Sequence, residues 1–400
     1  MKTFALLLAS ALFCTWPAFA QPNVKPANGL LYPLVSPQEA AHLGETKQLI
    51  DLHLRDVTLR QALDELQKQS GVTLDTSRGG DEATLSKHLS LDLKTHSLRE
   101  ACAAILDEAD VKGRLEGRNK SGDLKVLFGL EMPQELSVAP QSGLPAFQIH
   151  ALSLHSSSSK DVSLWKTPSR EEESSLNVAL RYDVDPQLSV IGSPHWRVTR
   201  AEDEKGCSLR GDQSKSGLSE FGFSASSGYD FVMLSGPRSD SRKLAHFDGA
   251  AVFVLRTKTQ HWEVPDALAA KGATHEFAST QTPLLVTISD ARLIGTSLHL
   301  NITLEPAQAS ATLPSLFQSS GSLTQSMRVT DADGHTLGSS GGIVGGKGNK
   351  TSAQMDFFLP DTPGSNKTGA QPGPFKLVFD LPTEFVQTEV PFSFSNLPLP

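Results

Sequence analysis

The sequence predicts an α+β module, with two helices on small sheets, followed by two all-β sandwich domains. Two runs of apolar residues with helical spacing, each preceded by a capping box, lie between residues 48 and 130. Apolar residues alternate as in strands from residue 144 onward. Motifs of this second part recur in the same order further along the chain, which indicates a duplicated β unit.

The composition indicates a folded protein that binds no nucleic acid. The chain has 400 residues, of which 38% are hydrophobic and 20% charged, so it can form large cores and is neither disordered nor collagen-like. Its formal net charge of −8 argues against a nucleic-acid binder, which normally has a basic face. Three cysteines are too few for a small scaffold held together by disulfides.

The first 20 residues have the features of a cleaved secretory signal peptide. Lys2 supplies a positive charge, Phe4–Phe13 is a short apolar run, and Ala18-Phe19-Ala20 fits a cleavage site before Gln21. The alternative is a buried N-terminal helix. No later segment approaches 18 uninterrupted apolar residues, so we expect no transmembrane helix after cleavage. The predicted location is therefore periplasmic or secreted.

Residues 21–47 contain four prolines and predict an extended lead-in. A first strand–helix unit follows. Leu49–Leu54 predicts a strand, Thr58–Gln61 fits a capping box, and Gly71 marks the end of the helix. The residues with helical spacing between these signals are Leu59, Ala62, Leu63 and Leu66.

The same order then repeats. Leu89–Leu93 predicts a strand, Ser97–Glu100 fits a second capping box, and strands are predicted at residues 113–116 and 124–128. One face of the second helix carries Leu98, Ala101, Cys102, Ile105 and Leu106. A sheet is the available partner for these two apolar helix faces, so the unit is predicted to form two layers.

The segments Ile50–Leu74 and Leu89–Leu106 resemble the secretin and TonB short N-terminal domain. In that family a strand precedes a V-x-L-x-x-A-L-x-x-L helix and an S-G stop, and a second strand and helix follow. Cys102 replaces the usual leucine of the second helix. The resemblance covers residues 48–128 and implies a periplasmic protein–protein interaction module of the kind attached to outer-membrane channels or receptors.

Residues 131–143 predict a linker, and two β-sandwiches are predicted at residues 144–270 and 271–400. Three pairs of motifs support the duplication, with offsets of 122, 128 and 126 residues: Leu176 and Leu298, Gly206 and Gly334, and Pro265 and Pro391. Each unit has the size of an immunoglobulin-like sandwich, which it resembles in its short alternating strands.

Candidate chemical motifs have simpler interpretations. Asp331-Ala-Asp333-Gly334 has part of the spacing of a calcium loop, but its later ligands are missing and a turn is the favoured interpretation. Gly341–Thr351 is glycine-rich, yet Gly346-Lys347 is not followed by the Ser or Thr of a phosphate loop. We therefore predict no catalytic, cofactor-binding or metal-binding residues, and no cofactor.

These observations predict a non-enzymatic, exported envelope protein that acts as a protein–protein interaction or adaptor module. One alternative is a β-sandwich that binds glycans or another ligand through exposed aromatic residues. Trp165, Trp196 and Trp262 are predicted to anchor the β cores or sheet edges, but Trp165 and Trp262 are the candidates for such a platform. A second alternative is a hydrolase with an unrecognised site.

Overall fold

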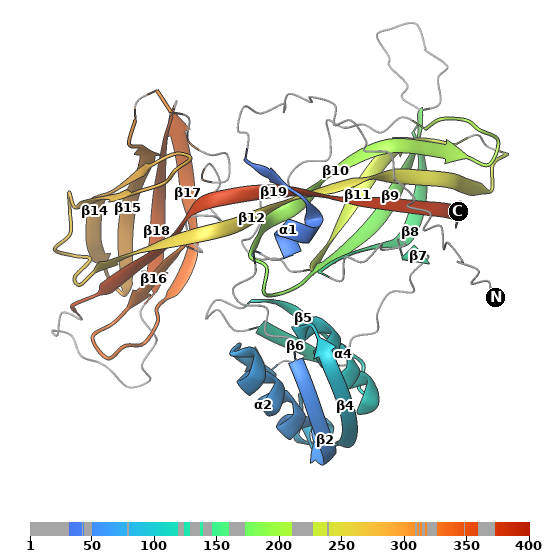
Figure 1. Cartoon of the computed structure of the whole chain (residues 1–400). Coiled ribbons are helices and arrows are strands. Elements are labelled where there is room, and N and C mark those ends of the chain that lie inside the picture. Colours follow the sequence, from blue (N-terminus) through green and yellow to red (C-terminus); the bar gives the residue numbers. More distant parts are fainter. Residues whose placement is uncertain are drawn as a thin grey trace, which may run out of the picture. The chain divides into compact units, whose positions relative to one another are not determined.

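In the computed structural model, strands dominate the part of the chain that is described (Figure 1). The chain divides into Met1–Leu31 and Tyr32–Pro400, and every described residue belongs to the second unit. The predicted signal peptide lies outside the described residues, as does most of the predicted linker. No described helix is long and apolar enough to cross a membrane. The described residues are 32–41, 43, 50–77, 80–118, 124–128, 137–138, 146–159, 173–209, 227–237, 240–308, 310–311, 313, 317, 326–347, 349–358 and 373–400.

The segment predicted as an α/β module contains two longer helices on short sheets. The longer elements form two strand–helix pairs: β2 (Ile50–Thr58) with α2 (Leu59–Ser70), and β4 (His88–His96) with α4 (Leu98–Glu108). The other elements are short: β3 (Leu74–Asp75), α3 (Glu82–Leu85), β5 (Gly113–Arg118) and β6 (Leu124–Phe128). β2 pairs antiparallel with β4, and β6 pairs with both β3 and β5. The module's apolar core is formed by residues 50–128 alone.

Both predicted capping boxes are confirmed. The Thr58 hydroxyl accepts the Gln61 amide at 3.3 Å, and the Gln61 side chain accepts the Thr58 amide at 2.9 Å. Ser97 and Glu100 form the same reciprocal pair at the start of α4. Gly71 ends α2 at φ 65°, a left-handed conformation that glycine adopts without steric cost. These helix boundaries follow from local sequence, which is why they were predictable.

The remaining strands form three larger sheets. One has the order β11 (Ser227–Ser235), β9 (Glu173–Val184), β8 (Phe147–Ser159), β7 (Ser137–Val138). A second has the order β13 (Thr274–Phe277), β14 (Leu284–Ile294), β15 (Ser297–Pro306), β18 (Lys350–Phe358), β17 (Gly338–Lys347). The third has the order β1 (Leu34–Val35), β19 (Lys376–Pro398), β12 (Lys243–Val264), β10 (Val190–Asp203), and β16 (Met327–Thr330) also pairs with β19. The predicted lead-in supplies β1 and the short helix α1 (Pro37–Ala41).

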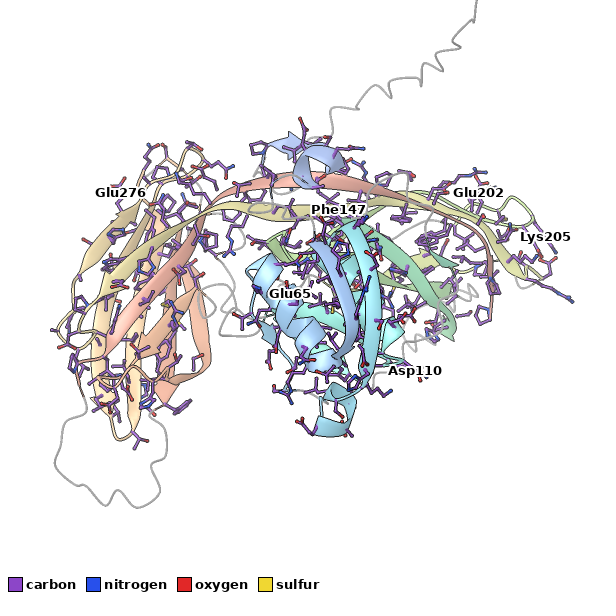
Figure 2. The ribbon with its side chains drawn as sticks, turned by 60° about the horizontal axis from the view of Figure 1, so that its bottom comes forward. Glu65, Asp110, Phe147, Glu202, Lys205 and Glu276 are labelled. Atoms are coloured by element: carbon purple, nitrogen blue, oxygen red, sulfur yellow. The ribbon has the colours of Figure 1, made fainter. Side chains whose placement is uncertain are left out.

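Two apolar cores lie between these sheets. The first core lies between the β11-β9-β8 sheet and the strands β10, β12 and β19; its large members include Phe147 (Figure 2), Tyr182, Trp196, Phe247, Phe253 and Phe394. The second core lies between the β14-β15-β18 sheet and the strands β12, β16 and β19; its large members include Phe277, Phe317, Phe357, Phe375, Phe379 and Phe385.

The strands β12 and β19 run through both cores as one long antiparallel ribbon, and Figure 1 shows them side by side. Leu255 of β12 packs in the first core, whereas Val264 of the same strand packs in the second. In β19 the order is reversed, because Phe385 belongs to the second core and Phe394 to the first. The end of the segment predicted as the second sandwich thus packs in the first core. Alternation along a strand shows which residues face a core, but not which core they face.

The two β units exchange strands through the ribbon, so that each core contains a strand from the other unit. The first core contains a row of buried residues on three adjacent strands: Ala201, Phe247 and Phe394. The second core contains the matching row: Val329, Leu377 and Val264. We call β8 to β12 the first repeat and β14 to β19 the second. In each row, one of the two outer residues comes from the first repeat and the other from the second.

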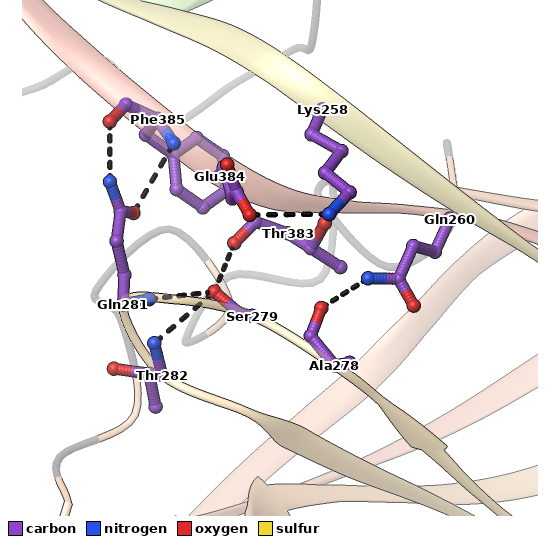
Figure 3. A network of polar contacts seen from close by, with 9 residues as sticks. All are labelled: Lys258, Gln260, Ala278, Ser279, Gln281, Thr282, Thr383, Glu384 and Phe385. Carbon is purple, nitrogen blue, oxygen red and sulfur yellow. Dashed lines mark hydrogen bonds and ion pairs between the residues drawn. The ribbon is translucent and has the colours of Figure 1, made fainter.

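A clamp of polar contacts holds the ribbon near the point where it passes between the cores (Figure 3). The pairing of β12 with β19 shifts around Lys258, which leaves Thr383 without a partner in the ladder. Ser279 Oγ donates to the Thr383 carbonyl at 2.6 Å. The Gln281 side chain donates to the Phe385 carbonyl at 2.6 Å and accepts its amide at 3.2 Å. These bonds give the Thr383 carbonyl and the Phe385 backbone hydrogen-bond partners outside the β12–β19 ladder.

Candidate functional site: the outer face of the β11-β9-β8 sheet

Two large aromatic side chains stand exposed on β11, the end strand of its sheet among the described residues. Val232 and Leu234 pack in the first core. Because successive side chains of a strand point to opposite faces, Tyr229 and Phe231 point outward. Their exposed fractions are 47% and 58%. We call the side of β11, β9 and β8 that faces away from the first core the outer face.

The outer face also carries a buried charged cluster. Arg181 and Asp183 lie on β9, and His150 lies opposite Arg181 on β8. Arg181 Nε donates to Asp183 Oδ2 at 2.8 Å, and His150 Nε2 lies 3.4 Å from the same oxygen. All three residues are at most 6% exposed. Charges are normally buried only when they are paired, so this cluster has a specific structural or functional role.

Arg99 of α4 joins this cluster from the α/β module. The Ser97 capping box fixes the first turn of α4, where Arg99 lies. The Arg99 guanidinium donates to Asp183 Oδ1 at 3.2 Å and also to the Val184 carbonyl. Desolvation lowers the pKa of Arg99, while the nearby charges of Asp183 and Asp185 oppose that shift. The two carboxylates therefore favour a charged guanidinium in a buried position.

The second repeat lacks this chemistry at the matching positions. In the first repeat, three charged or aromatic residues form one row across the sheet: His150, Arg181 and Tyr229. The matching row of the second repeat carries only hydroxyl side chains: Thr287, Thr303 and Ser352. Phe231 corresponds in the same register to Gln354. Since both repeats form a similar sheet, the fold alone does not require the residues of the first row.

Sequence inspection did not identify this site. Tyr229 and Phe231 point to one face of β11, and Val232 and Leu234 point to the other. Both pairs are large hydrophobic residues, so the sequence pattern could not tell the outer face from the core. The charged cluster was equally hidden, because it joins residues of β8 and β9 to Arg99 of α4, which are far apart in the sequence. The duplication is the signal that could have found the site, because aligning the two repeats shows the positions at which their residues differ.

Trp196 and Trp262 lie in or against the β cores, as predicted for core anchors. Trp196 is buried in the first core and donates from Nε1 to Asp230 at 2.9 Å. Desolvation raises the pKa of Asp230, although the hydrogen bonds from the Phe231 amide and Trp196 oppose this. The Trp262 ring is stacked on His275 and on Phe379, with centroid distances of 5.0 and 4.9 Å. Both faces of the Trp262 ring are therefore covered by side chains of the protein and are not available to stack on a sugar. Trp165 lies outside the described residues.

Asp331, Asp333 and His335 form one group whose ligand atoms lie within 4.8 Å of one another. Asp331 Oδ1 accepts the amides of Asp333 and His335 at 3.0 and 2.8 Å. Asp203 makes the same two bonds in the first repeat, at the same distances. Because turn hydrogen bonding explains both copies, this group supports the predicted turn.

The glycine-rich segment after this turn forms strands. The described part of Gly341–Thr351 belongs to β17 and β18, which pair antiparallel. Gly338–Gly342 also has the G-x-S-x-G spacing of a hydrolase nucleophile. That motif requires a turn from a strand into a helix, whereas these residues lie within β17.

The comparisons with known proteins give no further guide to the site. No protein-family model matches the chain, and no match was found among curated proteins or solved structures.

Proposed function

We propose that this protein is a non-enzymatic, exported envelope protein that binds another protein through the outer face of β11. The observation that carries the proposal is the pair Tyr229 and Phe231, which stand exposed together on an end strand. Aromatic residues are enriched at protein interfaces because they bury a large area at a low cost in side-chain entropy. The second repeat has Ser352 and Gln354 at these positions, as expected for a solvated surface.

The backbone of β11 supports the same proposal. Within the described residues, β9 pairs with one edge of β11 and no strand pairs with the other. A partner can add a strand to such an edge, in which case backbone hydrogen bonds give affinity and side-chain contacts give specificity. The partner we propose is therefore a protein with an extended segment, whose alternate side chains pack on Tyr229 and Phe231.

The α/β module gives independent support for an adaptor. Its two strand–helix units resemble the secretin and TonB short N-terminal domain, which implies a protein-binding role in the envelope. The module has its own apolar core. A chain with one such module and a separate aromatic surface can hold two partners, and this is what an adaptor requires.

Site-specific photo-crosslinking in the full chain tests the proposal. A photoreactive amino acid is placed at Phe231, and the matched control carries it at Gln354 of the second repeat. We expect a discrete protein adduct from position 231, which is lost when Tyr229→Ser is added, and no such adduct from position 354. Equal adducts at the two positions, or none at 231, would refute a protein site at β11. Binding to a glycan array that Phe231→Gln abolishes would replace the protein partner by a sugar.

A further inference from the structure

The α/β module contacts the first repeat through buried charges, without sharing an apolar core with it. The module's core is formed by residues 50–128, whereas residues of both β units form the other two cores. Arg99 reaches Asp183 and the Val184 carbonyl of β9. The Arg99 side chain is 14% exposed and that of Asp183 is 6% exposed. Interfaces of this polar kind join domains that move relative to each other.

The repeats show that this contact is specialised. Asp185 donates its amide to the Ala146 carbonyl at 2.7 Å, and Ala307 makes the matching bond to Pro283 at 2.8 Å. Asp185 therefore corresponds to Ala307 in the second repeat. By the same register Asp183 corresponds to Glu305, whose side chain is 34% exposed and pairs with Lys350 at 3.5 Å. The first repeat thus has an additional buried carboxylate where Arg99 binds.

We infer that Arg99 and Asp183 form a releasable clasp, which holds the α/β module on the charged end of the outer face. The aromatic end of that face, at Tyr229 and Phe231, stays exposed while the clasp is closed. Opening the clasp uncovers Asp183 and Arg181 in the strand next to Tyr229. The open protein then presents a larger surface, aromatic at one end and charged at the other. Only this last step rests on the proposed function.

The charges explain why the clasp can open without unfolding the first repeat. When Arg99 leaves, Asp183 keeps Arg181 at 2.8 Å, so its carboxylate does not become an unpaired buried charge. Water can then solvate both separated groups. A contact between apolar surfaces would lack this property, because separation would expose apolar area to water.

Small-angle X-ray scattering of the full exported chain tests the clasp independently of any partner. Arg99→Leu removes the guanidinium, and Lys350→Leu is the matched control because Lys350 faces the corresponding carboxylate Glu305. We expect a larger radius of gyration for Arg99→Leu and an unchanged value for Lys350→Leu. Scattering of Arg99→Leu that superimposes on that of the parent protein would overturn the inference.

A second variant covers the case in which Arg99→Leu does not fold, which circular dichroism would detect. Asp183→Asn keeps an oxygen that can accept from Arg181 but removes the carboxylate to which Arg99 donates. We expect the same increase in the radius of gyration for Asp183→Asn. If it folds with the dimensions of the parent protein, the clasp is refuted. Crosslinking at Phe231 is a separate measurement, so the clasp and the proposed function can fail independently.

Discussion

Asp203 and Asp331 hold the same turn at matching positions of the two repeats, 128 residues apart. In each turn, Oδ1 accepts the amides two and four residues later, at 3.0 and 2.8 Å. Each turn also contains a glycine with positive φ, at Gly206 and Gly334. This agreement in detail supports the duplication predicted from the sequence.

The two aspartates differ in what they add to stability. Asp203 is 1% exposed and also accepts the Ser241 hydroxyl at 2.7 Å, whereas the Asp331 side chain is 17% exposed. We expect Asp203→Ala to lower the free energy of unfolding by about 2–3 kcal/mol and Asp331→Ala to lower it by less, because buried groups left without partners cost more than exposed ones. Urea denaturation of both variants measures the difference. Equal losses would contradict this assignment of burial.

Phe394 tests the exchange of strands between the cores. It lies in the segment predicted as the second sandwich but packs on Phe247 in the first core, with ring centroids 6.2 Å apart. We expect Phe394→Ala to destabilise the protein by about 3–5 kcal/mol. Hydrogen exchange should become faster in β8 and β9 before it does so in β14 and β15. Val264→Ala, the corresponding change for the second core, should give the opposite order, and the same order for both variants would count against the exchange.

The two cysteines of the described chain should react differently with thiol reagents. Cys102 is 1% exposed, and desolvation raises the pKa of its thiol to about 12. Because the thiolate is the nucleophile, Cys102 should be inert in the native protein. Cys207 is half-buried and free. We expect alkylation followed by peptide mapping to modify Cys207 in native protein, and Cys102 only after denaturation.

His261 should make stability depend on pH. Its Nδ1–H donates to Asp380 Oδ1 at 2.9 Å, and its Nε2 lies 3.1 Å from Glu263. Asp380 and then Glu263 raise its pKa above the ordinary value of 6.5. A raised pKa in the folded state means that the stabilisation is full below 6.5 and is lost as the pH rises through the folded value.

The stability advantage of the parent protein over His261→Gln should therefore be largest in mild acid and shrink above neutral pH. Urea denaturation at several pH values measures it. A titration by nuclear magnetic resonance should show that Asp380→Asn lowers the pKa of His261. If Asp380→Asn leaves that pKa unchanged, the assigned cause is wrong.

Sequence patterns predicted the local features of this fold and missed the distant ones. The capping boxes at Thr58 and Ser97 were predictable, because the groups involved lie within three residues of one another. The pairing of β12 with β19 was not, since alternation identifies a strand without identifying its partner.

The candidate site was less predictable than the fold. No motif marks Tyr229 and Phe231, and the charges of Arg181 and Asp183 resemble those of an ordinary solvated strand. Asp183 binds Arg99, which lies more than 80 residues earlier in the chain. Local patterns carry no information about such a contact.

The long ribbon has a consequence for the order in which the protein folds. Residues from Val390 to Leu397 complete the first core, although about 135 residues separate them from the other strands of that core. The first β unit cannot close as soon as its own segment has emerged during synthesis. It stays open along one side until the second unit has been made, so the two units should reach their final form together, late and slowly.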